Sequence, residues 1–259
     1  MTYRTKLSGL LFLAGFAGIL SLLLLDLSAV LAMVPAREGT ELPSPWLLKL
    51  LSLIQPTVLL ALAVFVGVSL SPKVNLSAPA FEALARGRSF IAALKPQIIP
   101  GVIAGLIAAV VIVLSWAFLR PFMPVEFVTR AEAFNRLVPL PMRLLYGGIT
   151  EEILLRWGLL TLLVWVAWRV FQRGRHQPGA VCFVGAILIS SIVFGVGHLP
   201  VAVVIGGQLT LPVVLYVVTA NSVFGLMAGY LYWRKGLEAA ITAHMVAHVG
   251  LVSALYLGS

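Results

Sequence analysis

The sequence predicts an all-α, polytopic membrane protein: a helical bundle of about seven transmembrane helices, with one or two interfacial helices, forming a single integral-membrane domain over residues 1–259. Composition is the first reason, because 61% of the residues are hydrophobic and only 10% are charged, whereas soluble domains have about 25% charged residues. The second reason is that the apolar runs are continuous and about 20 residues long, which suits helices and not the alternating strands of outer-membrane barrels.

Seven apolar runs are long enough to cross a membrane, and prolines lie near several of their ends, where helix breakers are tolerated. The first run is too long for the hydrophobic region of a signal peptide, so we expect a retained span. The seven expected spans cover residues 7–33, 46–70, 98–119, 143–169, 180–198, 209–233 and 237–257.

Two connecting segments have the composition of helices that lie on a membrane surface. Residues 81–90 mix apolar and basic side chains, as an interfacial helix on an anionic membrane does. Residues 125–137 contain glutamate–arginine pairs at i,i+4 spacing in the favourable order, with the glutamate first. These expected pairs are Glu126 with Arg130 and Glu132 with Arg136.

The charge distribution indicates a cell-membrane protein and not a nucleic-acid-binding one. The net charge is +9, but the basic residues lie in loops between the spans. An arrangement with a cytoplasmic N-terminus places eleven basic residues inside and six outside, with Arg156 within the membrane, so the positive-inside rule favours it. Cys182 is the sole cysteine, which excludes an internal disulfide and a cysteine-rich metal site.

The fourth expected span contains two adjacent carboxylates and a guanidinium: Glu151, Glu152 and Arg156. A charged side chain at the bilayer centre costs about 2.5–3.5 kcal/mol on insertion scales, so intramembrane ionisable residues are candidates for function. Glu152 and Arg156 share a helix face at i,i+4 and can pair, while Glu151 is rotated by about 100° and can point toward a cavity. A purely structural ion pair with a spectator carboxylate is the alternative.

Three histidines lie in the later spans. His198 ends the fifth span and suits either a hydrogen-bonded interfacial residue or a catalyst. His244 and His248 lie one turn apart on the last span, a spacing typical of metal ligands and equally of hydrogen-bond donors. Because the three histidines and two glutamates all fall in residues 143–257, we expect these helices to form the catalytic part.

Two further polar residues in the spans have structural explanations. Asn221 in the sixth span is expected to bridge helices through its amide, with a functional role as the alternative. Asp26 in the first span is expected to be held by a neighbouring helix or to lie near an interface.

The ordered motifs Glu151-Glu152-x-x-x-Arg156, Phe194-x-x-x-His198 and His244-x-x-x-His248 resemble those of the CAAX protease and bacteriocin-processing family, also called CPBP or Abi, which includes the type II CAAX prenyl endopeptidases. The resemblance covers about residues 143–252. It implies an all-helical intramembrane endopeptidase with a cavity that reaches into the membrane, acting on a peptide or membrane-protein substrate in the lipid bilayer.

The resemblance also implies roles for these residues. Glu151 corresponds to the general base that activates water, His198 to a residue that positions this water, and His244 to the oxyanion-stabilising histidine. Glu152 and Arg156 correspond to a supporting pair. The family's last motif often ends in asparagine, whereas this sequence has His248, which can donate a hydrogen bond from one ring nitrogen and so act on the oxyanion side.

No cofactor is required by this interpretation, and two alternatives stay open. One is a zinc-dependent intramembrane metalloprotease with His198, His244 and Glu151 as ligands, although the sequence lacks the usual His-Glu-x-x-His signature. The other is a proton-coupled transporter whose carboxylates and histidines relay protons, although no inverted repeat is visible.

Overall fold

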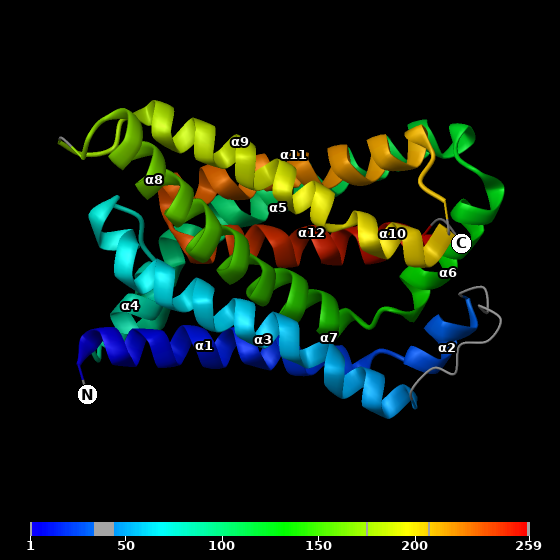
Figure 1. Ribbon diagram of the computed structural model, residues 1–259, viewed down its shortest axis with the longest axis horizontal. Helices are drawn as coiled ribbons and strands as arrows, with labels where there is room; N and C mark the ends of the chain where they lie inside the picture. Colours follow the sequence, from blue (N-terminus) through cyan, green and yellow to red (C-terminus); the bar gives the residue numbers. More distant parts are fainter. Residues whose placement is uncertain (1, 34–43, 175, 207, 258–259) are drawn as a thin grey trace.

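The computed structural model describes residues 2–33, 44–174, 176–206 and 208–257, and these residues form helices and no strands (Figure 1). Within them, seven helical stretches are long and apolar enough to cross a membrane, so the protein is a multi-pass helical bundle, as expected. In Figure 1, α1 begins at one end of the long axis and α12 ends at the other, as an odd number of spans requires. The seven stretches are Tyr3–Leu24, Pro45–Lys73, Phe90–Phe122, Leu140–Phe171, Ala180–Gly206, Leu211–Lys235 and Leu237–Tyr256.

The first span is shorter than the expected 7–33. α1 (Tyr3–Ser21) passes into the short 3₁₀ helix η1 (Leu22–Leu24), after which Leu25 is extended and the separate helix α2 (Leu27–Ala32) begins. Asp26 causes this break, because its Oδ1 accepts a hydrogen bond from the backbone N–H of Ala29 at 3.1 Å and caps α2. Asp26 is therefore an exposed helix cap outside the span.

The second and third spans are α3 (Pro45–Leu70), which lies beside α1 (Figure 1), and α5 (Phe90–Leu119), which begins eight residues before the expected 98. Between them lie η2 (Ser71–Lys73) and α4 (Pro79–Ala85). The expected interfacial helix over 81–90 is thus only partly helical, because residues 86–89 form a turn between α4 and α5. The first turn of α4 is held by a distant carboxylate: Oε1 of Glu238 accepts the N–H of Ala80 at 2.8 Å and of Phe81 at 2.9 Å.

The expected helix over 125–137 is confirmed as α6 (Val125–Leu137), which follows η3 (Arg120–Phe122). Glu126 and Arg130 form the expected ion pair at 2.6 Å. The prediction that Glu132 pairs with Arg136 is wrong. Glu132 pairs with Arg120 instead, at 3.1 Å. The turn through η3 folds Arg120 back over α6, which brings a guanidinium from outside the helix to this carboxylate.

The fourth span differs most from the expectation. After the single turn α7 (Leu140–Met142), the backbone is π-helical through η4 (Arg143–Glu151) and η5 (Ile153–Leu160) before α8 (Thr161–Phe171). A π-helix bonds residue i to i+5, is rare, and occurs frequently at functional sites. The rotation of about 100° between Glu151 and Glu152 that an α-helix imposes is therefore not the geometry of this segment.

Close contact with α1 accompanies this π-helical stretch. Thr150 donates a hydrogen bond to the carbonyl oxygen of Gly15 at 2.7 Å, and a Cβ added at Gly18 would lie 2.1 Å from the Thr150 hydroxyl oxygen. Only glycine at position 18 permits this approach. The first span thus supports the segment that contains Glu151 and Glu152.

The fifth span continues past the expected residue 198 because the helix breaks without leaving the bundle. α9 (Ala180–Gly197) ends at His198, and α10 (Leu199–Gly206) follows directly. The last two spans are α11 (Leu211–Lys235) and α12 (Leu237–Leu257), which pack against each other and against α5. His198 thus lies at a helix break that the hydropathy pattern does not reveal.

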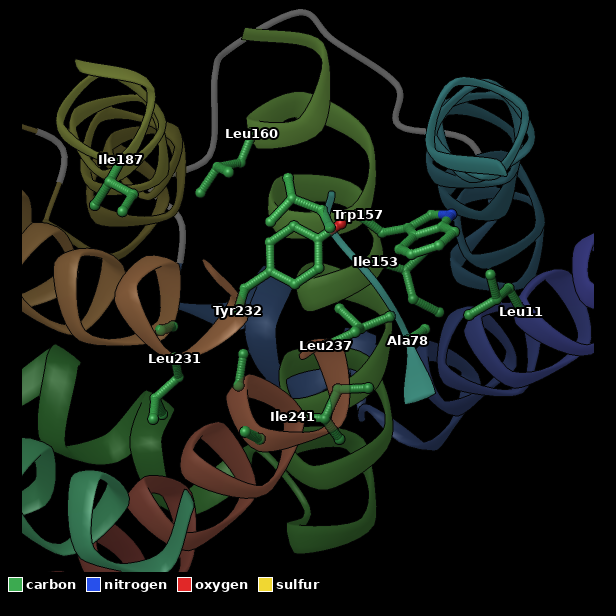
Figure 2. Close-up of a cluster of buried hydrophobic side chains, with 14 of the residues drawn as sticks. Leu11, Ala78, Ile153, Trp157, Leu160, Ile187, Leu231, Tyr232, Leu237 and Ile241 are labelled. Atoms are coloured by element: carbon green, nitrogen blue, oxygen red, sulfur yellow. The ribbon is translucent and has the colours of Figure 1, made fainter. Parts of the chain in front are cut away.

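Two groups of buried side chains fill the bundle. The larger joins α1, α3, η5, α9, α11 and α12, and Figure 2 shows Trp157 and Tyr232 at its centre with Leu11, Leu160 and Leu237 around them. The smaller group lies among α6, α10 and the start of α11, and includes Phe127, Ala202 and Val213. α6 and α10 therefore form a unit that is packed separately from the main core.

Candidate active site

The carboxylate of Glu152 is the centre of a buried polar cluster. Its Oε2 lies 3.2 Å from Nε of Arg156, and its Oε1 lies 2.8 Å from Nδ1 of His244. Glu152 is 0% exposed, Arg156 is 1% exposed and His244 is 5% exposed. A buried charge needs such partners, so the predicted Glu152–Arg156 pair forms, and Glu152 also joins the fourth span to the last.

Arg156 is held from two more helices. Its Nη2 donates to the carbonyl oxygen of Gly225 at 3.3 Å, and its guanidinium carbon lies 5.0 Å from the ring centre of Phe194 and 5.6 Å from that of Phe224. These distances are in the range of cation–π contacts. Phe194 belongs to a predicted motif, whereas the sequence gives Phe224 no role beyond its place one turn after Asn221.

His244 contacts both adjacent glutamates through different ring nitrogens. An ionised carboxylate only accepts hydrogen bonds, so the hydrogen between Glu152 and His244 belongs to Nδ1 of the imidazole. Its Nε2 then faces Glu151, whose Oε2 lies 3.9 Å away and whose side chain is 19% exposed. The structure therefore brings Glu151 and His244 together and orients the imidazole through Glu152.

Aromatic rings enclose His244 on both sides. The ring of His248 stacks on it at 4.8 Å between centres, with an angle of 16° between planes, and Phe224 contacts it at 4.3 Å. Nδ1 of His248 is buried and has no hydrogen-bond partner within the described residues. Gly147 lies against the same ring, since a Cβ there would be 2.5 Å from Nε2 of His248. Gly147 was not predicted to matter, because such a contact depends on how two spans pack.

His198 shares an aromatic neighbour, Phe194, with His244. Nδ1 of His198 donates to the carbonyl oxygen of Phe194 at 2.8 Å, since a carbonyl can only accept. The ring of Phe194 contacts both His198, at 4.7 Å, and His244, at 5.9 Å. His198 and His244 therefore contact the same aromatic ring.

A cavity of about 460 Å³ opens beside His198. Side chains of α5, α6, α10, α11 and α12 line it, mostly apolar ones, together with Asn135, Asn221 and three charged residues. The resemblance gives Glu151, His198 and His244 the catalytic roles. Of these three, His198 lines this cavity, whereas Glu151 and His244 are outside its lining. The charged residues of the lining are Glu132, Arg136 and Arg143.

The proposed zinc ligands are His198, His244 and Glu151. Among the described residues, no group of three His, Cys, Asp or Glu side chains is placed to hold a metal ion. His198 and His244 each use Nδ1 in a hydrogen bond to oxygen, so only Nε2 of each ring could meet a metal ion. The residues named as zinc ligands thus do not fit a three-ligand site as they are placed.

A known protein family matches the part of the chain that contains this cluster. Residues 133–250 match the model of the family described as type II CAAX prenyl endopeptidase Rce1-like, and this range contains all the predicted site residues. No curated protein and no solved structure matches the chain. The protein is therefore a membrane-embedded peptidase, and its residues 133–250 form a domain of the Rce1-like type II CAAX prenyl endopeptidase family.

Proposed function

We propose that this peptidase cleaves peptide bonds within the membrane with a water molecule that Glu151 activates. The observation that best supports this proposal is the contact between Glu151 and Nε2 of His244, with the imidazole held through Nδ1 by the buried Glu152. The carboxylate can act as the base for the attacking water, and the neighbouring imidazole can hydrogen-bond the carbonyl that this water attacks.

In the proposed reaction, the Glu151 carboxylate removes one proton from water while the water oxygen attacks the carbonyl carbon of the peptide. A tetrahedral oxyanion forms. Its collapse breaks the C–N bond, and Glu151 returns the proton to the leaving nitrogen, so that the products are a carboxylic acid and an amine. Glu151 therefore acts first as base and then as acid.

His244 and His248 are the proposed donors to the oxyanion. Nδ1 of His244 already bonds to Glu152, so donation from Nε2 requires the doubly protonated ring, whose positive charge faces the negative charge of Glu152. His248 stacks on this ring and has a buried Nδ1 without a partner among the described residues. Its Nδ1 is thus available for a bond that forms only when substrate is bound.

His198 is the proposed water-positioning residue. Because its Nδ1 donates to Phe194, its Nε2 is free to accept a hydrogen from water. His198 also lines the cavity, which is the route we propose for the substrate. Glutamate and histidine suffice for this chemistry, and we propose that no metal is required. Activity that survives prolonged dialysis against a chelator supports this, and loss that zinc restores contradicts it.

The direct test uses the purified protein and two internally quenched probes: a farnesylated CAAX peptide, chosen from the family's description, and the same peptide without the farnesyl group. Cleavage that requires Glu151 supports the proposal, and the comparison of probes shows whether the lipid is recognised. If neither probe is cleaved, and membranes containing wild-type or Glu151→Gln protein show the same peptides by proteomics, the proposal is wrong.

Replacing His248 by alanine should lower kcat by several-fold to about a thousandfold, because removing one oxyanion donor costs about 10²–10³ in rate. Asparagine, with an amide N–H of its own, should keep the rate within about tenfold of the wild type. His176→Ala is the control, since this histidine lies in a loop away from the cluster. Equal rates for His248→Ala and wild type would remove His248 from the mechanism.

Gly147→Ala tests whether packing against the π-helical segment orients His248. The added Cβ would lie 2.5 Å from Nε2 of His248, so the ring must move from its stack on His244. Since a displacement of about 1 Å can cost 10²-fold in rate, kcat should fall by about 10–100-fold. Gly9→Ala, with nothing within 4 Å of the new Cβ, should behave like the wild type. If the two variants have the same kcat, the packing of His248 is not important.

A further inference from the structure

Asn221 does not have the role expected of a buried amide in a helical bundle. Its Nδ2 donates to the carbonyl oxygen of Val217 at 2.7 Å, one turn earlier in the same helix. In the described part of the chain its side chain makes no hydrogen bond to another helix. A half-buried amide in an apolar span that bonds only its own helix leaves its Oδ1 and second N–H unused.

The cavity beside His198 is where Asn221 is found. Asn221 and His198 both line it, together with Val217, so the amide borders the same space as the proposed water-positioning histidine. The charged side chains of the lining are Glu132 and Arg136 of α6, and Arg143. Any peptide that enters this space has to find partners for its own N–H and C=O groups, because unpaired peptide groups are costly in an apolar surrounding.

Tight packing fixes Asn221 relative to His198. The neighbouring Ser222 donates to the carbonyl oxygen of Ser191 at 3.1 Å, and this bond joins α11 to α9. Gly195, three residues before His198, allows the close approach, since a Cβ there would lie 2.5 Å from the Ser222 hydroxyl oxygen. The amide and the imidazole are thus held on two helices that cannot shift easily past each other.

The same helix continues to the reacting centre. One turn after Asn221, Phe224 contacts the ring of His244 at 4.3 Å, and the carbonyl oxygen of Gly225 accepts from Arg156. Three residues of helix rise by roughly 4.5 Å, and an extended peptide advances by roughly 3.3–3.6 Å per residue. A peptide group bonded to Asn221 would therefore lie about one or two residues from the bond that is cleaved.

We infer that Asn221 is a substrate-binding residue that hydrogen-bonds the main chain of the peptide, one or two residues from the scissile bond. This rests on the proposed function. One side-chain oxygen and one remaining N–H match the N–H and C=O of a peptide group, whatever its side chain. Asn221 thus orients the substrate backbone in the cavity and leaves selectivity for side chains to the apolar walls.

The test is a double-mutant cycle between Asn221 and the substrate backbone. In a series of probe peptides, each peptide bond near the scissile bond is replaced in turn by an ester, which removes one N–H. For the wild type, one ester within two residues of the scissile bond should lower kcat/KM by about tenfold, the usual size of a lost hydrogen bond to a buried partner. In Asn221→Ala, kcat/KM for the all-amide peptide should be about tenfold lower, and the same ester should cause no further loss.

Ser222→Ala is the matched control. It lies next to Asn221 and removes a bond between helices, so it can lower the melting temperature, but the ester penalty should stay as in the wild type. The inference is wrong if every ester penalty persists in Asn221→Ala, or if this variant keeps the wild-type kcat/KM. The inference is also wrong if the ester penalty disappears in both Asn221→Ala and Ser222→Ala, because a general loosening of α11 would then explain the loss.

If the proposed peptidase function is wrong, the experimental result differs from the result expected when only the inference about Asn221 is wrong. If wild-type protein cleaves none of the probes, the peptidase mechanism fails, and binding of a fluorescent probe peptide to wild type and Asn221→Ala then decides the inference. About tenfold weaker binding to Asn221→Ala supports Asn221 as a peptide ligand. Equal binding, or none to either protein, overturns it.

Discussion

Glu151→Gln should lower kcat for peptide hydrolysis by about 10²–10⁴-fold, with little change in KM, and Glu151→Ala should abolish turnover. Glutamine has nearly the shape of glutamate but cannot accept a proton from water, and a positioned general base contributes about 10²–10⁴ to the rate. The side chain of Glu151 is the more exposed of the two adjacent carboxylates, at 19% against 0% for Glu152. It is therefore the one that water can reach.

A loss of folding would imitate this result, and the contacts of Glu151 allow the two to be separated. Its carboxylate is 3.9 Å from His244, and Glu152 makes the shorter bond to that ring, so glutamine at 151 should keep the melting temperature within a few degrees. Glu126→Gln is the control, since Glu126 is exposed on α6 and pairs with Arg130. Glu151→Gln with wild-type kcat would end the assignment of Glu151 as the base.

The spans were predictable because lipid offers the backbone no hydrogen bonds. Each apolar run must satisfy its own N–H and C=O groups as a helix, whatever its neighbours do. Hydropathy therefore located all seven spans, and the charge pattern located α6. The failures are local: Asp26 ends the first span early by capping α2, and Glu132 finds Arg120 in place of Arg136.

The site was predictable in its residues but not in its contacts. Spacing along one helix predicted the Glu152–Arg156 pair, because i,i+4 neighbours meet without help from the rest of the fold. The bond from Glu152 to His244 joins residues 92 positions apart, and the stack of His244 between His248 and Phe224 depends on packing. No local pattern encodes the π-helical turns, which accompany the contacts of Thr150 and Gly18 with α1.

Arg156→Met should destabilise the protein by about 3–5 kcal/mol, because it leaves the carboxylate of Glu152 buried without its counter-charge. Both side chains are almost fully buried, at 2% for Arg156 and 0% for Glu152. Methionine replaces the volume of the guanidinium stem but makes neither the hydrogen bond to Gly225 nor the ion pair with Glu152. Arg130→Met, which breaks the more exposed pair with Glu126, should cost less than about 1 kcal/mol.

Adding Glu152→Gln to Arg156→Met separates folding from catalysis. The double variant no longer buries a charge, so most of the lost stability should return, since apolar or neutral replacements of a buried pair are often tolerated. Peptidase activity should not return, because an amide at 152 removes the negative charge that faces the ring of His244 during the reaction. Unfolding of the purified variants in detergent, followed alongside kcat, tests both statements. If Arg156→Met is as stable as the wild type, the ion pair does not hold the cluster together; if the double variant regains activity, Glu152 does not act through His244.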